Sequence, residues 1–296
     1  MARDKFEEFH PGVQFLFFFA AVVITMCLIH PAFVVCSAVL AAAYLLLLRG
    51  RRAWRLLAIL LAVFAVISLI NPLVNPNGQI VLFTWLGGRP FCLESLFYGM
   101  ALGGMSVTVL MWFACYNTVM TSDKFLFLFG RFAPSLSLML TMVLRLVPDF
   151  TKKAGQIAGA RKCIGKAGEG SRKESAEDGA AVLSSLTSWA LEGGIIRADS
   201  MRSRGYGTGR RTSFSIYRWK GADRLLLPGM LALLLAALAC LFIGAAATSY
   251  VPRMEIAPLS NGKTLLGLLA YGCFLAIPTA LNIVEKIKWR SLRSKI

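Results

Sequence analysis

The chain has 296 residues, of which 57% are hydrophobic and only 16% are charged, and its mean hydropathy is +0.65. This composition excludes an ordinary soluble domain and is typical of a polytopic helical membrane protein. A net charge of +17 would favour nucleic acid as the partner of a soluble protein, but here the basic residues lie between and after apolar runs, where they orient membrane helices. We therefore expect a lipid bilayer around the chain and no nucleic-acid partner.

The sequence offers little chemistry for catalysis or for metal binding. His10 and His30 are its only histidines, so catalytic triads and the HExxH zinc motif cannot be assembled. The seven cysteines are scattered without CxxC spacing, which indicates neither a disulfide framework nor a metal site. No Walker motif is present, and the apolar runs contain almost no acidic residues, which argues against an ion-coupled carrier. We expect a protein that is not an enzyme, has no cofactor and takes its energy from a partner.

Four apolar runs near the start of the chain approach the length that crosses a bilayer, which is about 20 residues of helix. The predicted spans are residues 13–29, 32–48, 56–70 and 95–116. Four arginines between residues 49 and 55 follow the second run at once, and such a cluster marks the cytoplasmic side. Residues 71–94 contain several prolines and glycines and only two charges, so we place them outside, with a short strand or a re-entrant piece at residues 80–86.

Residues 124–147 are apolar enough for a further crossing but are interrupted by glycine, proline and two arginines, and they end at Pro148. If they crossed, residues 151–224 would lie outside with fifteen lysines and arginines, against the tendency of basic segments to stay inside. We therefore place residues 124–147 at the cytoplasmic face. A second helix is expected over residues 152–165, and the composition of residues 165–179 predicts a solvated loop.

Two more spans are predicted at residues 225–247 and 265–284, followed by a basic tail. The chain is thus predicted to be an all-α polytopic membrane protein of the cell membrane, with about six transmembrane helices and both termini in the cytoplasm. The predicted domains are an N-terminal membrane domain with four spans (1–123), a cytoplasmic or interfacial helical domain between the fourth and fifth spans (124–224), and a C-terminal membrane hairpin with the basic tail (225–296).

A basic segment, residues 197–212, stands out between the apolar blocks. A helix over residues 182–201 is expected to run toward it and to end at three alternating glycines that begin with Gly205, because glycine tolerates the left-handed backbone of a helix end. Arg197 and Arg204 are seven residues apart and share a helix face, and each guanidinium donates in a fixed fork to carboxylates or carbonyls. This pattern predicts a docking element that inserts into a groove. The alternative is that these arginines are only topology signals or contacts with lipid headgroups.

Three motifs resemble one family. The sequence Ala-Asp-Ser-Met-Arg-Ser-Arg-Gly-Tyr-Gly at residues 198–207 resembles the second Ala-Arg-Gly signature of the transmembrane T component (EcfT/CbiQ-like) of energy-coupling factor (ECF) ABC transporters. Leu-Arg-Leu-Val-Pro at residues 144–148 is similar to the family's arginine-proline stretch, and Ala-Gly-Ala-Arg at residues 158–161 resembles its first signature. The chain departs from the family at Ser203, where alanine is usual, and at Lys162, where glycine is usual.

This resemblance implies that two cytoplasmic coupling helices reach grooves on a pair of ABC-type ATPase subunits, a homodimer or a heterodimer, while the membrane part holds a small S component. The S component would bind the substrate, a vitamin or a metal ion. The residues implied in ATPase coupling are Arg161, Arg197, Arg202, Arg204 and Gly205, with Arg145, Pro148 and Ala160 as further support. Arg161 and Arg204 would be the residues inserted into the grooves. For Arg145 and Pro148, anchoring of a helix end at the membrane interface is an equal alternative.

Two other functions stay open at the level of the sequence. The chain could be an ordinary ABC permease that binds its substrate itself and works without an S component. It could also be a membrane scaffold or an integral membrane enzyme whose arginines hold anionic lipid. Protein partners distinguish these functions, because only the coupling function requires both ATPases and an S component.

Overall fold

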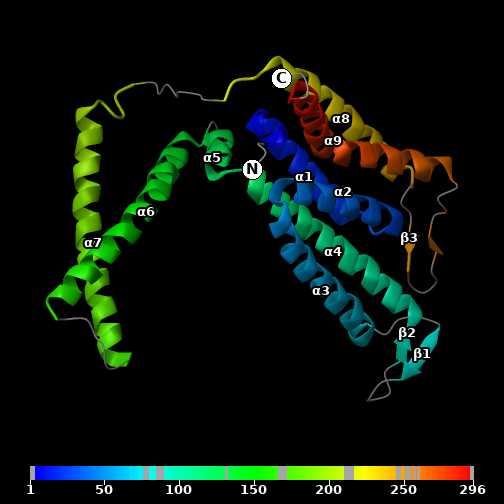
Figure 1. Cartoon of the computed structure of the whole chain (residues 1–296), viewed down its shortest axis with the longest axis horizontal. Coiled ribbons are helices and arrows are strands. Elements are labelled where there is room, and N and C mark those ends of the chain that lie inside the picture. Colours follow the sequence, from blue (N-terminus) through cyan, green and yellow to red (C-terminus); the bar gives the residue numbers. More distant parts are fainter. Residues whose placement is uncertain are drawn as a thin grey trace. The chain divides into compact units, whose positions relative to one another are not determined.

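The computed structural model describes residues 4–75, 80–84, 90–130, 133–165, 172–209, 217–244, 248–250, 255–256, 258 and 261–293. Most of these residues are helical (Figure 1). The helices are α1 (Pro11–Cys27), α2 (Pro31–Arg49), α3 (Arg51–Val74), α4 (Leu93–Val119), α5 (Ser122–Gly130), α6 (Pro134–Cys163), α7 (Arg172–Ser203), α8 (Gly221–Phe242) and α9 (Gly262–Arg293), with a 3₁₀ turn η1 at Phe6–Glu8. This content confirms the predicted all-α polytopic membrane protein.

Two antiparallel hairpins accompany the helices in the described part of the chain. Strands β1 (Val81–Thr84) and β2 (Pro90–Cys92) form the first, and strands β3 (Thr248–Ser249) and β4 (Glu255–Ile256) form the second. The sequence allowed a strand or a re-entrant piece at residues 80–86, and the structure shows the strand.

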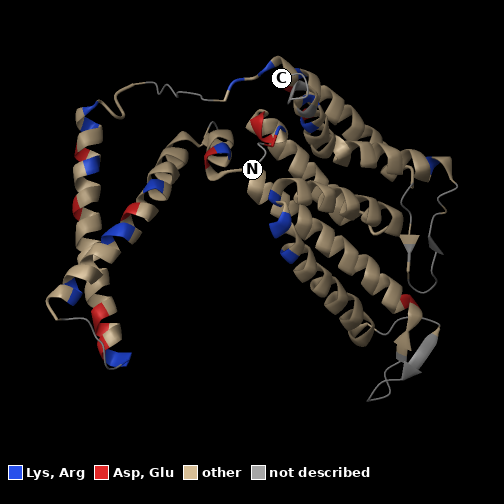
Figure 2. Ribbon diagram, viewed as in Figure 1, with Lys and Arg blue, Asp and Glu red and all other residues tan. Residues whose placement is uncertain are grey.

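Five helices are long and apolar enough to cross a membrane, namely α2, α3, α4, α8 and α9, while α1 is apolar but has only 17 residues. At 1.5 Å per residue α1 spans about 26 Å, which is slightly less than the bilayer core. Helix α3 begins at Arg51 and continues through Pro72, so it is longer at both ends than the predicted span. The arginines of its first turns therefore belong to the helix, and Figure 2 shows lysines and arginines gathered where α2 ends and α3 begins.

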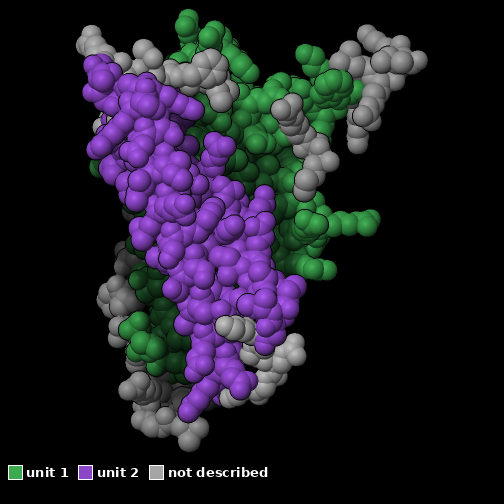
Figure 3. All heavy atoms as spheres, turned by 90° about the vertical axis from the view of Figure 1, so that its left-hand side faces the viewer, with its two compact units in different colours: residues 1–125, 217–296 green, residues 126–216 purple. Residues whose placement is uncertain are grey.

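The chain divides into two compact units (Figure 3). Unit 1 comprises Met1–Phe125 and Tyr217–Ile296 and contains the six apolar helices. Unit 2 comprises Leu126–Ile216 and contains the end of α5 together with α6 and α7.

Unit 1 has a closely packed interior. The ring of Trp112 on α4 is fully buried, 5.8 Å from Phe17 and 6.4 Å from Phe18 on α1, and its indole nitrogen donates to Ser37 Oγ on α2 at 3.0 Å. Gly99 on α4 allows a close approach to α3, because a Cβ atom there would lie 2.8 Å from the carbonyl oxygen of Ser68. Aromatic packing and small residues at helix contacts are the usual means of joining membrane helices.

In unit 2, helices α6 and α7 run antiparallel to one another. Phe150 packs edge-on against Trp189 at 5.7 Å between ring centroids, Lys153 lies 5.7 Å from the centre of the same indole, and Arg161 forms an ion pair with Asp178. No residue of α6 or α7 is buried. A few side-chain contacts therefore hold this helix pair together.

The structure corrects two expectations about unit 2. Helix α6 runs unbroken through Pro148, where the sequence predicted an end, because one proline removes one backbone hydrogen bond and the rest of this 30-residue helix remains. Residues 172–179 begin α7, whereas a solvated loop was predicted over residues 165–179; their Lys, Glu and Ala side chains favour helix. Residues 166–171 of that predicted loop lie outside the described residues.

Candidate functional site

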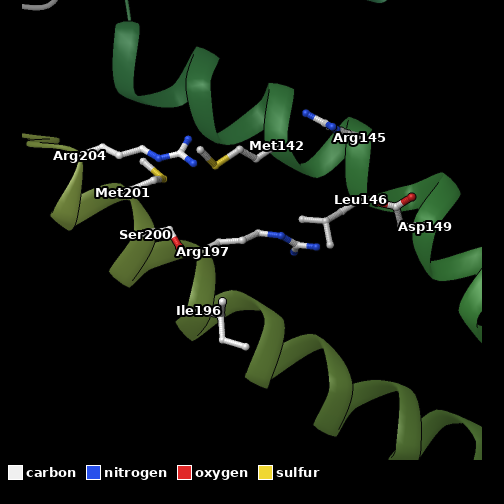
Figure 4. Close-up of a pocket in the computed structure, with 9 residues that line it drawn as sticks. All are labelled: Met142, Arg145, Leu146, Asp149, Ile196, Arg197, Ser200, Met201 and Arg204. Atoms are coloured by element: carbon white, nitrogen blue, oxygen red, sulfur yellow. The ribbon is translucent and has the colours of Figure 1, made fainter.

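A groove of about 460 Å³ lies between α6 and α7, wholly within unit 2 (Figure 4). The residues that line it are Met142, Arg145, Leu146 and Asp149 from α6, and Ile196, Arg197, Ser200, Met201 and Arg204 from the end of α7. Three arginines and one aspartate give its lining an excess of positive charge. Such a lining favours an acidic group, because guanidinium groups bind carboxylates with short, charge-assisted hydrogen bonds.

The end of α7 is fixed by a glycine turn. Gly205 has a φ of +79°, its N–H donates to the carbonyl of Arg202 at 2.9 Å, and the N–H of Tyr206 donates to the carbonyl of Met201 at 3.0 Å. These two bonds are those of a Schellman motif, which ends a helix at a left-handed residue. The motif holds Arg204 directly after Ser203, the last residue of α7. The sequence predicted this helix end and its glycine correctly.

Arg197 and Arg204 lie on the same wall of the groove, as their spacing predicted. In Figure 4 both side chains extend from α7 toward α6, that of Arg197 toward Leu146 and that of Arg204 toward Met142. The Arg197 guanidinium folds back near Gly193, one turn earlier in α7, where a Cβ atom would lie at ordinary contact distance, 3.9 Å from Nη1. The two guanidinium groups therefore lie over apolar side chains of α6.

The α6 wall follows helical spacing, since Arg145 and Leu146 lie three and four positions after Met142 and four and three positions before Asp149. Arg145, which the resemblance implied as a supporting residue, is brought to the same groove as Arg197 and Arg204. Its guanidinium points away from α7 in Figure 4. Arg145 therefore lies at the rim of the groove.

The other residues implied in coupling do not line this groove. Arg161 is half-buried in an ion pair with Asp178 and joins the end of α6 to the start of α7. Ala160 is exposed near the end of α6, and Arg202 is exposed in the last turn of α7. Pro148 lies inside α6, where its carbonyl accepts a hydrogen bond of 2.8 Å from the hydroxyl of Thr151. The structure thus groups Arg145 with Arg197 and Arg204, and places Arg161 in a contact of its own.

Several residues of this region were missed in the sequence. Asp178 lay in a segment predicted to be a loop, so its pairing with Arg161 could not be seen. Asp149 lay where α6 was expected to end, so its helical spacing from Met142 and Arg145 was lost. That spacing was the signal for the α6 wall, and it becomes visible once Pro148 is read as helical.

The part of the chain that the structure describes contains no group of three or more His, Cys, Asp or Glu residues placed to hold a metal ion. The groove offers guanidinium groups and apolar side chains, together with the carboxylate of Asp149 and the hydroxyl of Ser200.

Comparison with known families assigns the chain. Residues 5–215 match the model of the CbiQ family, described as cobalt transport protein. The chain belongs to this family. The match covers more than two thirds of the chain and confirms the resemblance seen in the sequence. No individual curated protein matches the chain.

Membership in the CbiQ family makes the chain a membrane component of a cobalt or ECF-type transporter and, with its apolar helices, a multi-pass membrane protein. The matched residues contain α1 to α7, and hence both the groove and the Arg161–Asp178 pair. Helices α8 and α9 follow the matched residues.

Proposed function

We propose that this CbiQ-family protein is the transmembrane coupling subunit of an ECF-type ABC importer. In this function it transmits the ATP-driven motion of two cytoplasmic ATPase subunits to a small membrane S component that binds the substrate. The observation that carries the proposal is the groove of unit 2, where Arg197 and Arg204 share a wall and Arg145 lies at the rim. An acidic surface of an ATPase subunit is the complement of this lining.

The proposed mechanism is mechanical. Closure of the ATPase pair on ATP moves the groups bound to α6 and α7, and these two long helices pass the displacement on as levers. The Schellman motif at Gly205 supports this role, because it holds Arg204 in one backbone geometry at the helix end. The chain itself catalyses no reaction and needs no cofactor, since ATP hydrolysis takes place on the partners.

The placement in the membrane is part of the proposal. The arginines at the start of α3 and the basic residues of unit 2 favour a cytoplasmic location for both, with both termini inside and the chain in the cell membrane. The description of the family favours a cobalt ion over a vitamin as the transported substrate. In this division of labour the ion is bound by the S component.

The first experiment is purification of the tagged protein from its native membrane in mild detergent, with mass spectrometry of the proteins that accompany it. Two ABC ATPase chains and a small hydrophobic protein support the proposal. ATPases with a soluble binding protein would favour an ordinary permease. The chain alone with anionic lipid would favour a scaffold.

A charge reversal tests the groove itself. Arg204→Glu should leave membrane insertion intact and abolish co-purification of the ATPases, because it places a carboxylate against the expected acidic partner. Arg172→Glu is the matched control, since Arg172 is an exposed arginine at the other end of the same helix. Retained co-purification and retained uptake in Arg204→Glu would contradict the proposal.

A further inference from the structure

The N-terminal segment, residues 4–10, lies inside unit 1. The first residues of a domain are usually poorly ordered unless something ties them down. Here Phe6 is fully buried, and Asp4 and His10 are each 9% exposed. Phe6 packs edge-on against Phe17 of α1 at 5.4 Å. The segment is therefore a packed part of the helix bundle.

Lys124, near the start of α5, holds this segment from one side. Its side chain is almost fully buried, and Nζ donates to the carbonyl of Glu7 at 2.9 Å, to Oε1 of Gln14 at 3.1 Å and to the carbonyl of Val119 at 3.0 Å. An ammonium group has three donors, and all three are used. Burial lowers the pKa of Lys124, while the nearby charges of Glu7 and Asp4 oppose this effect.

Asp223, in the first turn of α8, holds the segment from another side. Its carboxylate is 1% exposed and accepts from the N–H of His10 at 3.0 Å and from the N–H of Lys220 at 2.7 Å. The His10 ring also stacks on Trp219 with 4.1 Å between ring centroids. One carboxylate therefore joins the N-terminal segment to the beginning of α8.

The same segment is bonded to two further helices. The hydroxyl of Tyr44 on α2 donates to Asp4 at 2.7 Å, and this pair is buried. The N–H of Lys5 donates to Oδ1 of Asn282 on α9 at 2.9 Å. Residues 4–10 thus connect α2, α5, α8 and α9, helices that are far apart in the sequence.

Two of these connections lie where the chain leaves and re-enters unit 1. Helix α5 begins in unit 1 and ends in unit 2, and Lys124 is in its first turn. Unit 1 resumes at Tyr217, a few residues before Asp223. The chain passes between the two units at these two places, and a loose connection there would absorb motion passed along the chain.

We infer that residues 4–10 are a clamp that fixes both chain connections of unit 2, with Lys124 and Asp223 as its positioning residues. The inference rests on the proposed function, because it concerns how the motion of unit 2 is passed to unit 1. Removing either residue uncouples transport from ATP hydrolysis, while the ATPases still assemble on unit 2.

The test uses the complete transporter in vesicles and measures substrate transported per ATP hydrolysed. Lys124→Met keeps an unbranched side chain that is one atom shorter and removes the charged donors. We expect it to lower this ratio about fivefold or more, which is the scale of typical coupling between sites, with ATPase activity retained. Thr25→Val is the matched control, because Thr25 is also buried and hydrogen-bonded, to Tyr271 at 2.8 Å, but does not contact the clamp.

An unchanged ratio in Lys124→Met, or an equal loss in Thr25→Val, would overturn the inference. If Lys124→Met does not fold, Trp219→Ala tests the same point, because it removes the ring that stacks on His10. Trp219 is half-exposed, so its replacement leaves the buried interior intact. Trp219→Ala is expected to lower the ratio in the same direction.

A second measurement separates this inference from the proposed function. In the isolated chain, Lys124→Met should speed hydrogen exchange of α5 amides about tenfold, because the clamp suppresses local opening. If no ATPase accompanies the protein but this acceleration is found, the clamp stands and the proposed function fails. An unchanged exchange rate in α5 would overturn the clamp inference, whether or not ATPases accompany the protein.

Discussion

The interiors of the two units differ. Unit 1 fills its interior with side chains that have no exposed surface, such as Trp112, Tyr44 and Phe274. Unit 2 buries no residue of α6 or α7, and the first half of α6 leaves Leu136 and Met139 more than 60% exposed. Unit 1 also exposes large apolar side chains, such as Leu225 at 80% and Phe242 at 91%, but these lie on a helix that is apolar enough to cross a membrane. The two units therefore differ in that unit 1 has a buried interior and α6 and α7 of unit 2 have none.

The sharpest test of this difference compares one tryptophan in each unit. Trp112→Ala should destabilise unit 1 by about 3 to 5 kcal/mol, because it leaves a cavity against Phe17 and Phe18. Trp189→Ala should cost about 1 to 2 kcal/mol, since it removes one aromatic pair and one cation–π contact of a side chain that is only partly buried. Hydrogen exchange resolved by helix measures both free energies in the same protein.

The locality of each effect matters as much as its size. Trp112→Ala should speed exchange in α1, α2 and α4, and Trp189→Ala only in α6 and α7. Equal costs at the two positions would show that unit 2 has a core of its own and would end the comparison.

A smaller effect is expected at the end of α7. Gly205→Ala should destabilise the turn by about 1 to 2 kcal/mol, because the φ of +79° is unfavourable for a residue with a Cβ atom. Gly194→Ala, inside the same helix and with open space around it, should stabilise α7 by about 0.5 to 1 kcal/mol. The same chemical change thus has opposite signs, and exchange of the last amides of α7 reports them.

The same two glycine variants also test how the ATPases dock. If Arg204 acts through its position at the helix end, Gly205→Ala lowers ATPase co-purification and Gly194→Ala does not. Equal co-purification of the ATPases with the two variants would mean that the backbone at Gly205 has no part in docking.

The membrane helices could be predicted from the sequence, because length and hydropathy alone decide whether a run can cross a bilayer. The end of α7 could also be predicted, since Gly205 supplies a backbone geometry that other residues avoid. The shared face of Arg197 and Arg204 followed from helical periodicity. In each case the decisive physics is local in the sequence.

The features that the sequence did not predict depend on residues that are distant from one another in the chain. Continuation of α6 through Pro148 is decided by the whole helix, and the proline rule alone gave the wrong answer. The pairing of Arg161 with Asp178 required α7 to begin at Arg172. The bonds from Lys124 and Asp223 to the N-terminal segment leave no periodic pattern, because backbone groups accept or donate most of them.

The smallest expected effect concerns His10, and it tests whether the closely packed interior of unit 1 extends to the N-terminal segment. Burial lowers the pKa of His10 below its usual value of 6.5, and the charge of Asp223 opposes this only in part. The folded protein therefore binds fewer protons than the unfolded chain near this pH, so stability rises with pH. The contribution of His10 to stability is complete above pH 6.5 and is lost as the pH falls through the lowered pKa.

His10→Asn is the control for this prediction. Nδ1 of His10 caps α1 by accepting from the N–H of Gly12 at 3.1 Å, and asparagine can make the same cap but does not titrate. Between pH 7.5 and pH 5, the thermal stability of the natural protein should fall more steeply than that of the variant. Identical slopes would mean that water reaches His10 as freely as it reaches α6 and α7.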